Sequence, residues 1–190
     1  MSGLQLDTRK TALVVIDLQK GITGAPTAPY SSAEVMERSS RLAKAFREKS
    51  GTVVYVRVDM ANVLQLPVDA PMRAPDATPP PASAAELTSE SGFQPGDLVI
   101  TKRHWGAFAG TELEQELKRR GVDTVVLTGI STNVGVESTA RQGTGLGFAF
   151  VVVEDACAGR DANDHRLAFE KTFPRLARVR KTDEVIAALR

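Results

Sequence analysis

The chain has 190 residues, a formal net charge of +1, two histidines and one cysteine. This length suits one domain with a full hydrophobic core and is too short for two ordinary ones. The balanced charge excludes the basic surface that a nucleic acid or an anionic membrane would require. A single cysteine and the lack of a secretory or membrane-spanning pattern favour the cytoplasm, and so few nitrogen and sulfur ligands predict no zinc site.

Strand patterns and helix patterns alternate along the chain. Apolar, β-branched runs predict six strands, at residues 11–17, 52–58, 97–101, 125–127, 148–153 and 177–179. Amphipathic segments predict five helices, at residues 31–50, 111–120, 132–146, 164–173 and 182–190. Ser31 with Glu34, and Thr111 with Glu114, have the spacing of a capping box that begins a helix. The alternation predicts a parallel sheet with helices on both faces.

Residues 60–96 lack any periodicity and contain seven of the ten prolines. A loop of this length inside a compact domain is a lid, an oligomer arm or a disordered segment. A linker between two domains is the alternative, although neither flank has enough chain to fold alone. We therefore expect a lid or an arm within one domain that spans residues 1–190.

Three groups that could carry chemistry lie at predicted strand ends. Asp17 ends the first strand, Lys102 follows the third, and the Ser131–Gly135 turn leads from the fourth into a helix. The carboxyl ends of parallel strands share one edge of the sheet, where ligands bind. There the amine can keep the carboxylate ionised or bind a substrate anion, and free N–H groups at the helix start can stabilise negative charge. Position alone leaves open that these charges are merely solvated.

Three segments, in this order, resemble the isochorismatase-like hydrolases, also called the cysteine hydrolase superfamily. They are TALVVIDLQKGI around Asp17, ITKRHWGAFAGTELEQEL around Lys102 and VVLTGISTNVGVESTARQG around Gly135. The resemblance covers nearly the whole chain. It implies a three-layer αβα, Rossmann-like fold with six parallel strands, and a catalytic Asp, Lys and Cys at the carboxyl edge. It also implies a cis peptide between Ile130 and Ser131, and an oxyanion hole made by the N–H groups of Ser131 and residue 135.

Gly135 stands where the cysteine branch of that family has its nucleophile. Without a thiol, amide hydrolysis through a thioester is not available at this position. The isochorismatases within the resemblance hydrolyse a vinyl ether instead: the Asp protonates the alkene carbon and water takes the resulting cation. This would require a raised pKa for Asp17, and Lys102 would bind a substrate carboxylate or the departing enolate oxygen. The alternative is an inactive family member that acts as a binding or assembly protein, which the helix-weakening Gly143 and Gly145 favour.

Four further residues are candidate contacts for a small anionic substrate. Trp105 and Phe108, in the turn after Lys102, could wall a ring-bearing molecule or only pack that turn. Asp59, after the second strand, could bond substrate or only face water. The histidines that complete the metal site of nicotinamidases are missing beside it. Asn133 is most simply a helix cap near the oxyanion hole.

Two weaker hypotheses use other nucleophiles. Cys157 follows the fifth predicted strand with nothing beside it to lower its pKa, so a structural thiol is favoured over the nucleophile of an amidase. Ser131, Asp155 and His165 have the chain order of an α/β-hydrolase triad, but the G-x-S-x-G elbow is missing. We therefore expect a hydrolase of a small anionic substrate, without metal or cofactor, that assembles as a homodimer or homotetramer.

Overall fold

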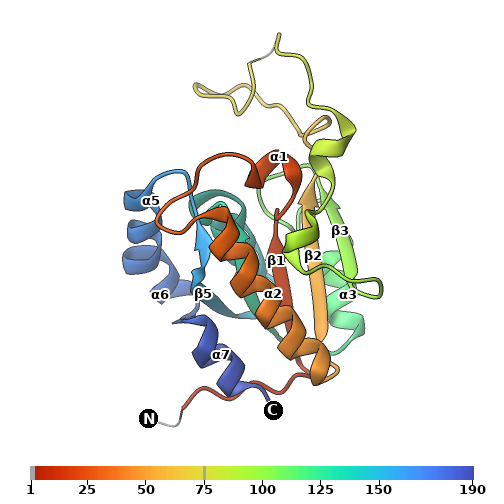
Figure 1. Cartoon of the computed structure of the whole chain (residues 1–190), viewed down its shortest axis with the longest axis vertical. Coiled ribbons are helices and arrows are strands. Elements are labelled where there is room, and N and C mark those ends of the chain that lie inside the picture. The colour runs from red at the N-terminus through yellow and green to blue at the C-terminus, as the bar shows by residue number, and fades with distance from the viewer. Residues whose placement is uncertain (1–2, 75) are drawn as a thin grey trace.

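The computed structural model describes residues 3–74 and 76–190 and contains a six-stranded, fully parallel sheet (Figure 1). The strand order is β3-β2-β1-β4-β5-β6. The strands are β1 (Thr11–Ile16), β2 (Thr52–Val58), β3 (Leu98–Lys102), β4 (Thr124–Ile130), β5 (Ala149–Ala158) and β6 (Arg178–Arg180). The predicted α/β class with six parallel strands is confirmed.

Helices cover both faces of the sheet. They are α1 (Lys20–Thr23), α2 (Ser32–Glu48), α3 (Leu113–Arg119), α4 (Glu137–Gly145), α5 (Ala162–Leu167), α6 (Phe173–Leu176) and α7 (Thr182–Ala188). Shorter turns are the 3₁₀ turns η1 (Ala82–Ala85) and η2 (Ser89–Ser91) and the π-helical turns η3 (Thr132–Val136) and η4 (Ala168–Thr172). Helices α2 and α7 pack on one face, and α3, α4 and α6 pack on the other (Figure 1). In the described ranges, no helix is long and apolar enough to cross a membrane.

Alternate residues of the strands pack into two separate hydrophobic cores, one on each face of the sheet. In β1, Val14 and Ile16 pack with α3 and α4, whereas Leu13 and Val15 pack with α2. All six residues of β1 are buried, because a central parallel strand is covered on both faces. Each buried aliphatic side chain of this kind contributes about 1.5–3 kcal/mol relative to its exposed state. The two cores hold the carboxyl edge of the sheet rigid beneath the candidate site.

The two predicted capping boxes have opposite outcomes. At the start of α2, the N–H of Glu34 donates to Ser31 Oγ at 3.2 Å, and the Glu34 carboxylate accepts from the N–H of Ser31 at 2.9 Å. The second box is wrong, since α3 begins at Leu113 without any side-chain cap. Thr111 Oγ1 instead donates to the carbonyl of Ala107 at 2.5 Å, which closes the turn between β3 and α3.

Strand β5 is longer than predicted. The prediction ends the strand at residue 153 and places a loop next, but β5 continues to Ala158 and therefore includes Cys157. The polar residues Glu154 and Asp155 interrupt the apolar run of the strand. The sequence pattern therefore does not show that the strand continues after them. They lie where the register between β4 and β5 shifts, so the strand resumes pairing after them.

The first part of the Pro-rich segment 60–96, residues 60–74 and 76–84, runs beyond the carboxyl ends of the strands and away from the body of the molecule, and is the projecting segment (Figure 1). From η2 on, the chain returns along α2 (Figure 1), where Ser91 is buried and its carbonyl accepts from the Tyr55 hydroxyl at 2.8 Å. The irregularity of segment 60–96 agrees with the prediction, whereas its role as a lid or arm stays a prediction.

The buried Gln19 side chain holds the two ends of the projecting segment together. Its Nε2 donates to the carbonyls of Val58 at 3.0 Å and Ala84 at 2.9 Å. One buried amide thus connects the start and the end of the projecting segment.

Candidate active site

A buried carboxyl group and a buried amine meet at the carboxyl edge of the sheet. Asp17 directly follows β1, and Lys102 is the last residue of β3. Asp17 Oδ2 lies 2.8 Å from Lys102 Nζ, and the two residues are 6% and 2% exposed. Lys102 Nζ also donates to the carbonyl of Trp105 at 2.7 Å. The two side chains that the sequence assigned to this edge therefore face each other.

Asp17 is unusual in its backbone, its pKa and its hydrogen bonding. Its φ of 55° lies in the left-handed region, where Asp and Asn are among the better tolerated non-glycine residues. Burial raises the pKa of the Asp17 carboxyl, and the charge of Lys102 opposes this shift without cancelling it. The second oxygen, Oδ1, is buried and has no hydrogen-bond partner within the described part of the chain. A carboxyl group in this state is suited to pass a proton to a bound molecule.

Gly135 adjoins this pair. A Cβ atom on residue 135 would lie 3.0 Å from Lys102 Nζ, 3.2 Å from Asp17 Oδ2 and 2.9 Å from a methyl group of Ile16. These separations are tighter than side chains normally show, so a Cβ here requires small shifts of the Ile16 methyl group and of the flexible end of Lys102. The absence of a side chain at Gly135 lets the pair approach the backbone of the turn.

The turn between β4 and α4 begins with the cis peptide Ile130–Ser131 that the family resemblance implied. The carbonyl of Ser131 accepts from the N–H groups of Val134 at 3.2 Å and Val136 at 3.1 Å. Residues 132–136 form the π-helical turn η3, and the regular helix α4 starts only at Glu137. The first N–H groups of a helix lack partners within it, so this turn can accept an anion.

Helix α4 is tied to the turn that follows β3. The N–H of Ala107 donates to Thr139 Oγ1 at 3.0 Å, and that hydroxyl donates to the carbonyl of Gly135 at 2.6 Å. One turn further, the N–H of Phe108 donates to Gln142 Oε1 at 3.2 Å. These bonds fix the segment that carries Lys102 against the segment that carries Gly135.

Phe108 belongs to the core, so its prediction as a pocket-lining residue is wrong. It is buried and stacks on Phe148 with ring centroids 5.6 Å apart. A Cβ on Gly143 would collide with the rings of Phe108 and Phe150, whereas a Cβ on Gly145 would meet nothing within 4 Å. Gly143 is therefore required for the close approach of α4 to this core, rather than being a sign of a decayed helix.

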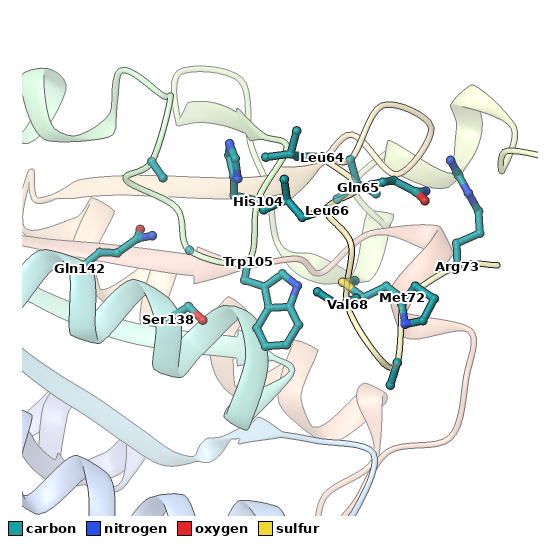
Figure 2. Close-up of a pocket in the computed structure, with 15 residues that line it drawn as sticks. Leu64, Gln65, Leu66, Val68, Met72, Arg73, His104, Trp105, Ser138 and Gln142 are labelled. Carbon is teal, nitrogen blue, oxygen red and sulfur yellow. The ribbon is translucent and has the colours of Figure 1, made fainter. Parts of the chain in front are cut away.

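Trp105 lines a cavity of about 370 Å³ between α4 and the projecting segment (Figure 2). The indole lies between Ser138 on α4 and Val68 and Met72 of the segment (Figure 2). Polar groups on the wall include Arg73. Neither Asp17 nor Lys102 lines this cavity, but Lys102 is connected to its wall because Nζ donates to the Trp105 carbonyl. The cavity is within the size range of small-molecule sites.

Two other predicted contacts lie elsewhere. Asp59 accepts from the side-chain amide of Asn62 at 3.0 and 3.2 Å, which lowers the pKa of its carboxyl, and it lines a separate cavity of about 290 Å³. Asn133 does not cap a helix, because its amide donates to Asp164 Oδ2 at 3.0 Å and η3 has no side-chain cap. The structure thus brings neither side chain to the Asp17–Lys102 pair.

The alternative nucleophiles do not form sites. Cys157 is fully buried within β5, and burial raises the pKa of its thiol far above the ordinary value. The Ser131–Asp155–His165 triad is wrong, because Asp155 Oδ1 accepts from the N–H and hydroxyl of Thr182 at 2.8 and 2.9 Å. Between residues 3 and 190, residue 75 apart, no three His, Cys, Asp or Glu side chains are grouped to hold a metal ion.

Sequence reasoning missed several polar residues around the site. Gln19 follows Asp17 by two positions, and its burial could not be read from a Gly-rich loop. Thr139 carried no signal beyond a polar position on an amphipathic helix. Ser138, three residues after Gly135, could have been found by helical spacing, since residues i and i+3 share one helix face.

A three-layer α/β fold with an acid–amine pair at its strand ends defines the class of protein, and the comparisons with known proteins agree. A family profile described as Isochorismatase domain matches residues 11–184. The uncharacterized isochorismatase family protein YecD of Escherichia coli O157:H7 is 46% identical over 190 residues, covering 98% of this chain and 100% of its own. Its counterpart YwoC of Bacillus subtilis is 41% identical, covering 98% and 97%. The chain belongs to the isochorismatase family.

Solved structures give the same result. An isochorismatase family protein from Burkholderia thailandensis has a TM-score of 0.90 and 38% identity, with 98% of each chain covered. N-carbamoylsarcosine amidase from Thermoplasma acidophilum has a TM-score of 0.72 and 26% identity, covering 92% of this chain and 97% of its own.

Proposed function

We propose that this protein is a hydrolase of the isochorismatase type that works without a cysteine nucleophile on a small anionic substrate. One observation carries the proposal: Asp17, with a raised pKa and an unpartnered oxygen, contacts Lys102 beside Gly135. On the family resemblance, Gly135 stands at the place of the cysteine nucleophile. The buried Cys157, the one cysteine of the chain, offers no replacement for it.

The chemistry that suits an acid without a nucleophile is hydrolysis of a vinyl ether. Asp17 in its protonated form transfers its proton to the terminal alkene carbon, which leaves a cation stabilised by the ether oxygen. Water adds to the cationic carbon, and the hemiketal collapses to a ketone and an alcohol. The proton released by the added water returns to the Asp17 carboxylate. The net reaction consumes one water and leaves the enzyme unchanged.

Lys102 and the turn then bind the negative charge of the substrate. An ammonium group has three N–H donors, and Asp17 and the Trp105 carbonyl accept two of them. The third can bond a substrate carboxylate. The N–H groups of Ser131 and Gly135 supply further donors at a site where little water competes, which makes each bond stronger.

The cavity beside Trp105 supports a substrate with an apolar or ring-bearing part. Leu64, Leu66, Val68, Met72 and Trp105 are all more than half exposed, and all of them line this cavity. Burying such side chains against a ligand is favourable by about 25 cal/mol per Å² of apolar area. We place the non-reacting part of the substrate here, with its vinyl ether directed toward Asp17.

The proposal is tested by measuring pyruvate release from isochorismate with purified protein. We expect turnover by the wild-type protein and its loss in Asp17→Asn and in Lys102→Met. Asp123→Asn, an exposed carboxylate that precedes β4, is the matched control and should retain full activity. Turnover that persists in Asp17→Asn would overturn the proposal.

The alternative is a member that has kept the fold and lost catalysis, acting as a binding or assembly protein. Gly135→Cys separates the two, because an intact site of amides and Lys102 lowers the pKa of a new thiol. We expect this thiol to react with iodoacetamide at neutral pH at least about tenfold faster than a free thiol of ordinary pKa. A rate no higher than that of Cys157 favours the inactive member.

We further propose that the chain forms a homodimer or homotetramer through the projecting segment. The exposed apolar side chains Leu64, Leu66, Val68 and Met72 support this, because patches of this kind commonly mark contacts with other chains. Since the same side chains line the substrate cavity, the cavity would then lie at the contact between two copies. Sedimentation equilibrium of the wild-type protein and of Leu66→Ser tests it. An unchanged mass in Leu66→Ser, or a monomeric wild type, would argue against this contact.

A further inference from the structure

A bulge in β5 presents a carboxylate to the far side of the catalytic turn. Val152 pairs with Leu127, and Cys157 pairs with Gly129. Between these two pairs β5 advances by five residues while β4 advances by two. Glu154 lies in this bulge. Bulges of this kind commonly redirect a side chain next to a functional site. Here the redirected side chain is the Glu154 carboxylate.

Glu154 is the first member of a chain of hydrogen bonds that ends on the turn. Its Oε1 lies 3.3 Å from His165 Nε2, and Tyr30 donates its hydroxyl to both carboxylate oxygens, at 3.0 and 3.2 Å. His165 Nδ1 lies 2.9 Å from Thr132 Oγ1. Thr132 is the first residue of η3, and both Thr132 and His165 are buried. Residues from the loop before α2, from β5 and from α5 are thus joined at the Ser131–Gly135 turn.

The direction of the bonds to Glu154 follows from its carboxylate. The bonds from His165 and Tyr30 lower the pKa of Glu154, so its carboxylate is ionised at neutral pH and only accepts. His165 must therefore donate from Nε2, and its Nδ1 shares a hydrogen bond with the Thr132 hydroxyl on the other side of the ring. This order, hydroxyl to imidazole to carboxylate, is that of a catalytic triad.

Nucleophilic attack by Thr132 is excluded by its position, because its side chain is fully buried. What the chain of bonds does is restrain the turn. A second bond, from Asn133 to Asp164, ties the next residue of η3 to α5. The backbone of the turn, in which Gly135 lies beside the Asp17–Lys102 pair, is thus held at Thr132 and Asn133.

We infer that Glu154 and His165 are positioning residues, which hold the Ser131–Gly135 turn in place through the Thr132 hydroxyl. This inference rests on the proposed function, since it takes that turn to be the anion-binding part of the active site. Neither residue touches the substrate. Their effect is on where the amides of the turn lie when negative charge develops.

Amide hydrogen exchange measured by NMR tests the restraint without any substrate. In Thr132→Val, which keeps the shape and removes the hydroxyl, exchange at Val134 and Val136 should rise about tenfold, the effect of one lost hydrogen bond. Exchange in β1 should not change. Thr132→Ser keeps the hydroxyl and should restore wild-type exchange, and His165→Asn, which cannot reach Glu154, should resemble Thr132→Val. Unchanged exchange at the turn, or a rise that is equal throughout the chain, overturns the inference.

Kinetics with isochorismate then separate positioning from structural support. In Thr132→Val and His165→Asn we expect kcat to fall about tenfold while KM changes less than twofold, because a misplaced donor weakens the transition state more than the ground state. Equal kcat in wild type and both variants overturns the inference. If the wild-type protein has no turnover, the proposed function fails, and the exchange experiment alone decides the restraint.

Discussion

Asp17 and Glu154 lie on either side of the same turn, and the fold treats their carboxyl groups in opposite ways. Asp17 is 6% exposed and keeps one oxygen without a partner within the described residues, and burial raises the pKa of its carboxyl. Glu154 has each oxygen bonded by Tyr30 and one also by His165, and these bonds lower the pKa of its carboxyl.

On the proposed function, the difference separates a reactive acid from a structural one. A buried carboxyl group stays protonated to a higher pH, because burial raises its pKa. If one of its oxygens has no hydrogen-bond partner, the group can transfer its proton to a ligand. A carboxylate whose two oxygens both accept hydrogen bonds is stabilised as an anion and can orient the side chains that donate to it. The same residue chemistry thus supports two roles, which are set by the number of donors that the fold supplies.

The largest expected effect is on activity at Asp17. Asp17→Asn keeps a side chain that tolerates the left-handed backbone but cannot deliver a proton, so kcat/KM for isochorismate should fall by about 10³ or more. Glu154→Gln should lose only about tenfold, because it acts on the position of the turn. Steady-state kinetics of both variants check this. Equal losses in the two variants would erase the distinction between the two acids.

Lys102→Met should have the next largest effect. Removing the ammonium takes away a donor to the developing anion, which is expected to lower kcat/KM by about 10² to 10³. The pKa of Asp17 should rise further, because Lys102 is the group that opposes the effect of burial. The basic limb of the pH–rate profile, where activity falls as Asp17 loses its proton, reports this shift. Lys118→Met, which removes an exposed ammonium paired with Glu114 on α3, serves as the control.

The two acids should also give opposite pH dependences of stability. The folded-state pKa of Asp17 is raised above 3.8, so its contribution is present below that pH and lost as the pH rises through the folded value. The folded-state pKa of Glu154 is lowered below 4.5, so its contribution is present above that pH and lost as the pH falls.

Thermal unfolding from pH 3 to 8 measures this contrast. Relative to Asp17→Asn, the wild-type protein should lose stability as the pH is raised above about 4. Relative to Glu154→Gln, it should lose stability as the pH is lowered below about 4.5. If the stability of the wild-type protein relative to each variant changed with pH in the same direction for Asp17→Asn and Glu154→Gln, the predicted contrast between the two carboxyl groups would be wrong.

The smallest effect is expected at Tyr30. Tyr30→Phe removes a hydroxyl that donates to Glu154 and leaves the ring, which Arg38 covers at 4.6 Å from its centroid. The free energy of unfolding should fall by about 0.5–1.5 kcal/mol, because one hydrogen bond is lost at a half-buried position. Urea denaturation checks this value. A larger loss than that of Glu154→Gln would mean that the tyrosine, and not the histidine, is the main partner of the carboxylate.

We could predict from local patterns the strand–helix alternation, the parallel sheet and the edge at which Asp17, Lys102 and Gly135 meet. Short-range patterns carry this information, since buried strands are apolar throughout and parallel strands end at a common edge. The capping box of Ser31 and Glu34 was predictable for the same reason, because it depends on residues three positions apart.

The polar residues that support the site could be identified only from the folded chain. The continuation of β5 through Glu154 and Asp155, the burial of Phe108 under Gly143 and the bond between His165 and Thr132 depend on contacts between distant segments. Local patterns carry no signal for such contacts. The raised pKa of Asp17 has the same origin, because the burial that raises it comes from the packed edge of the sheet and not from its neighbours in the chain.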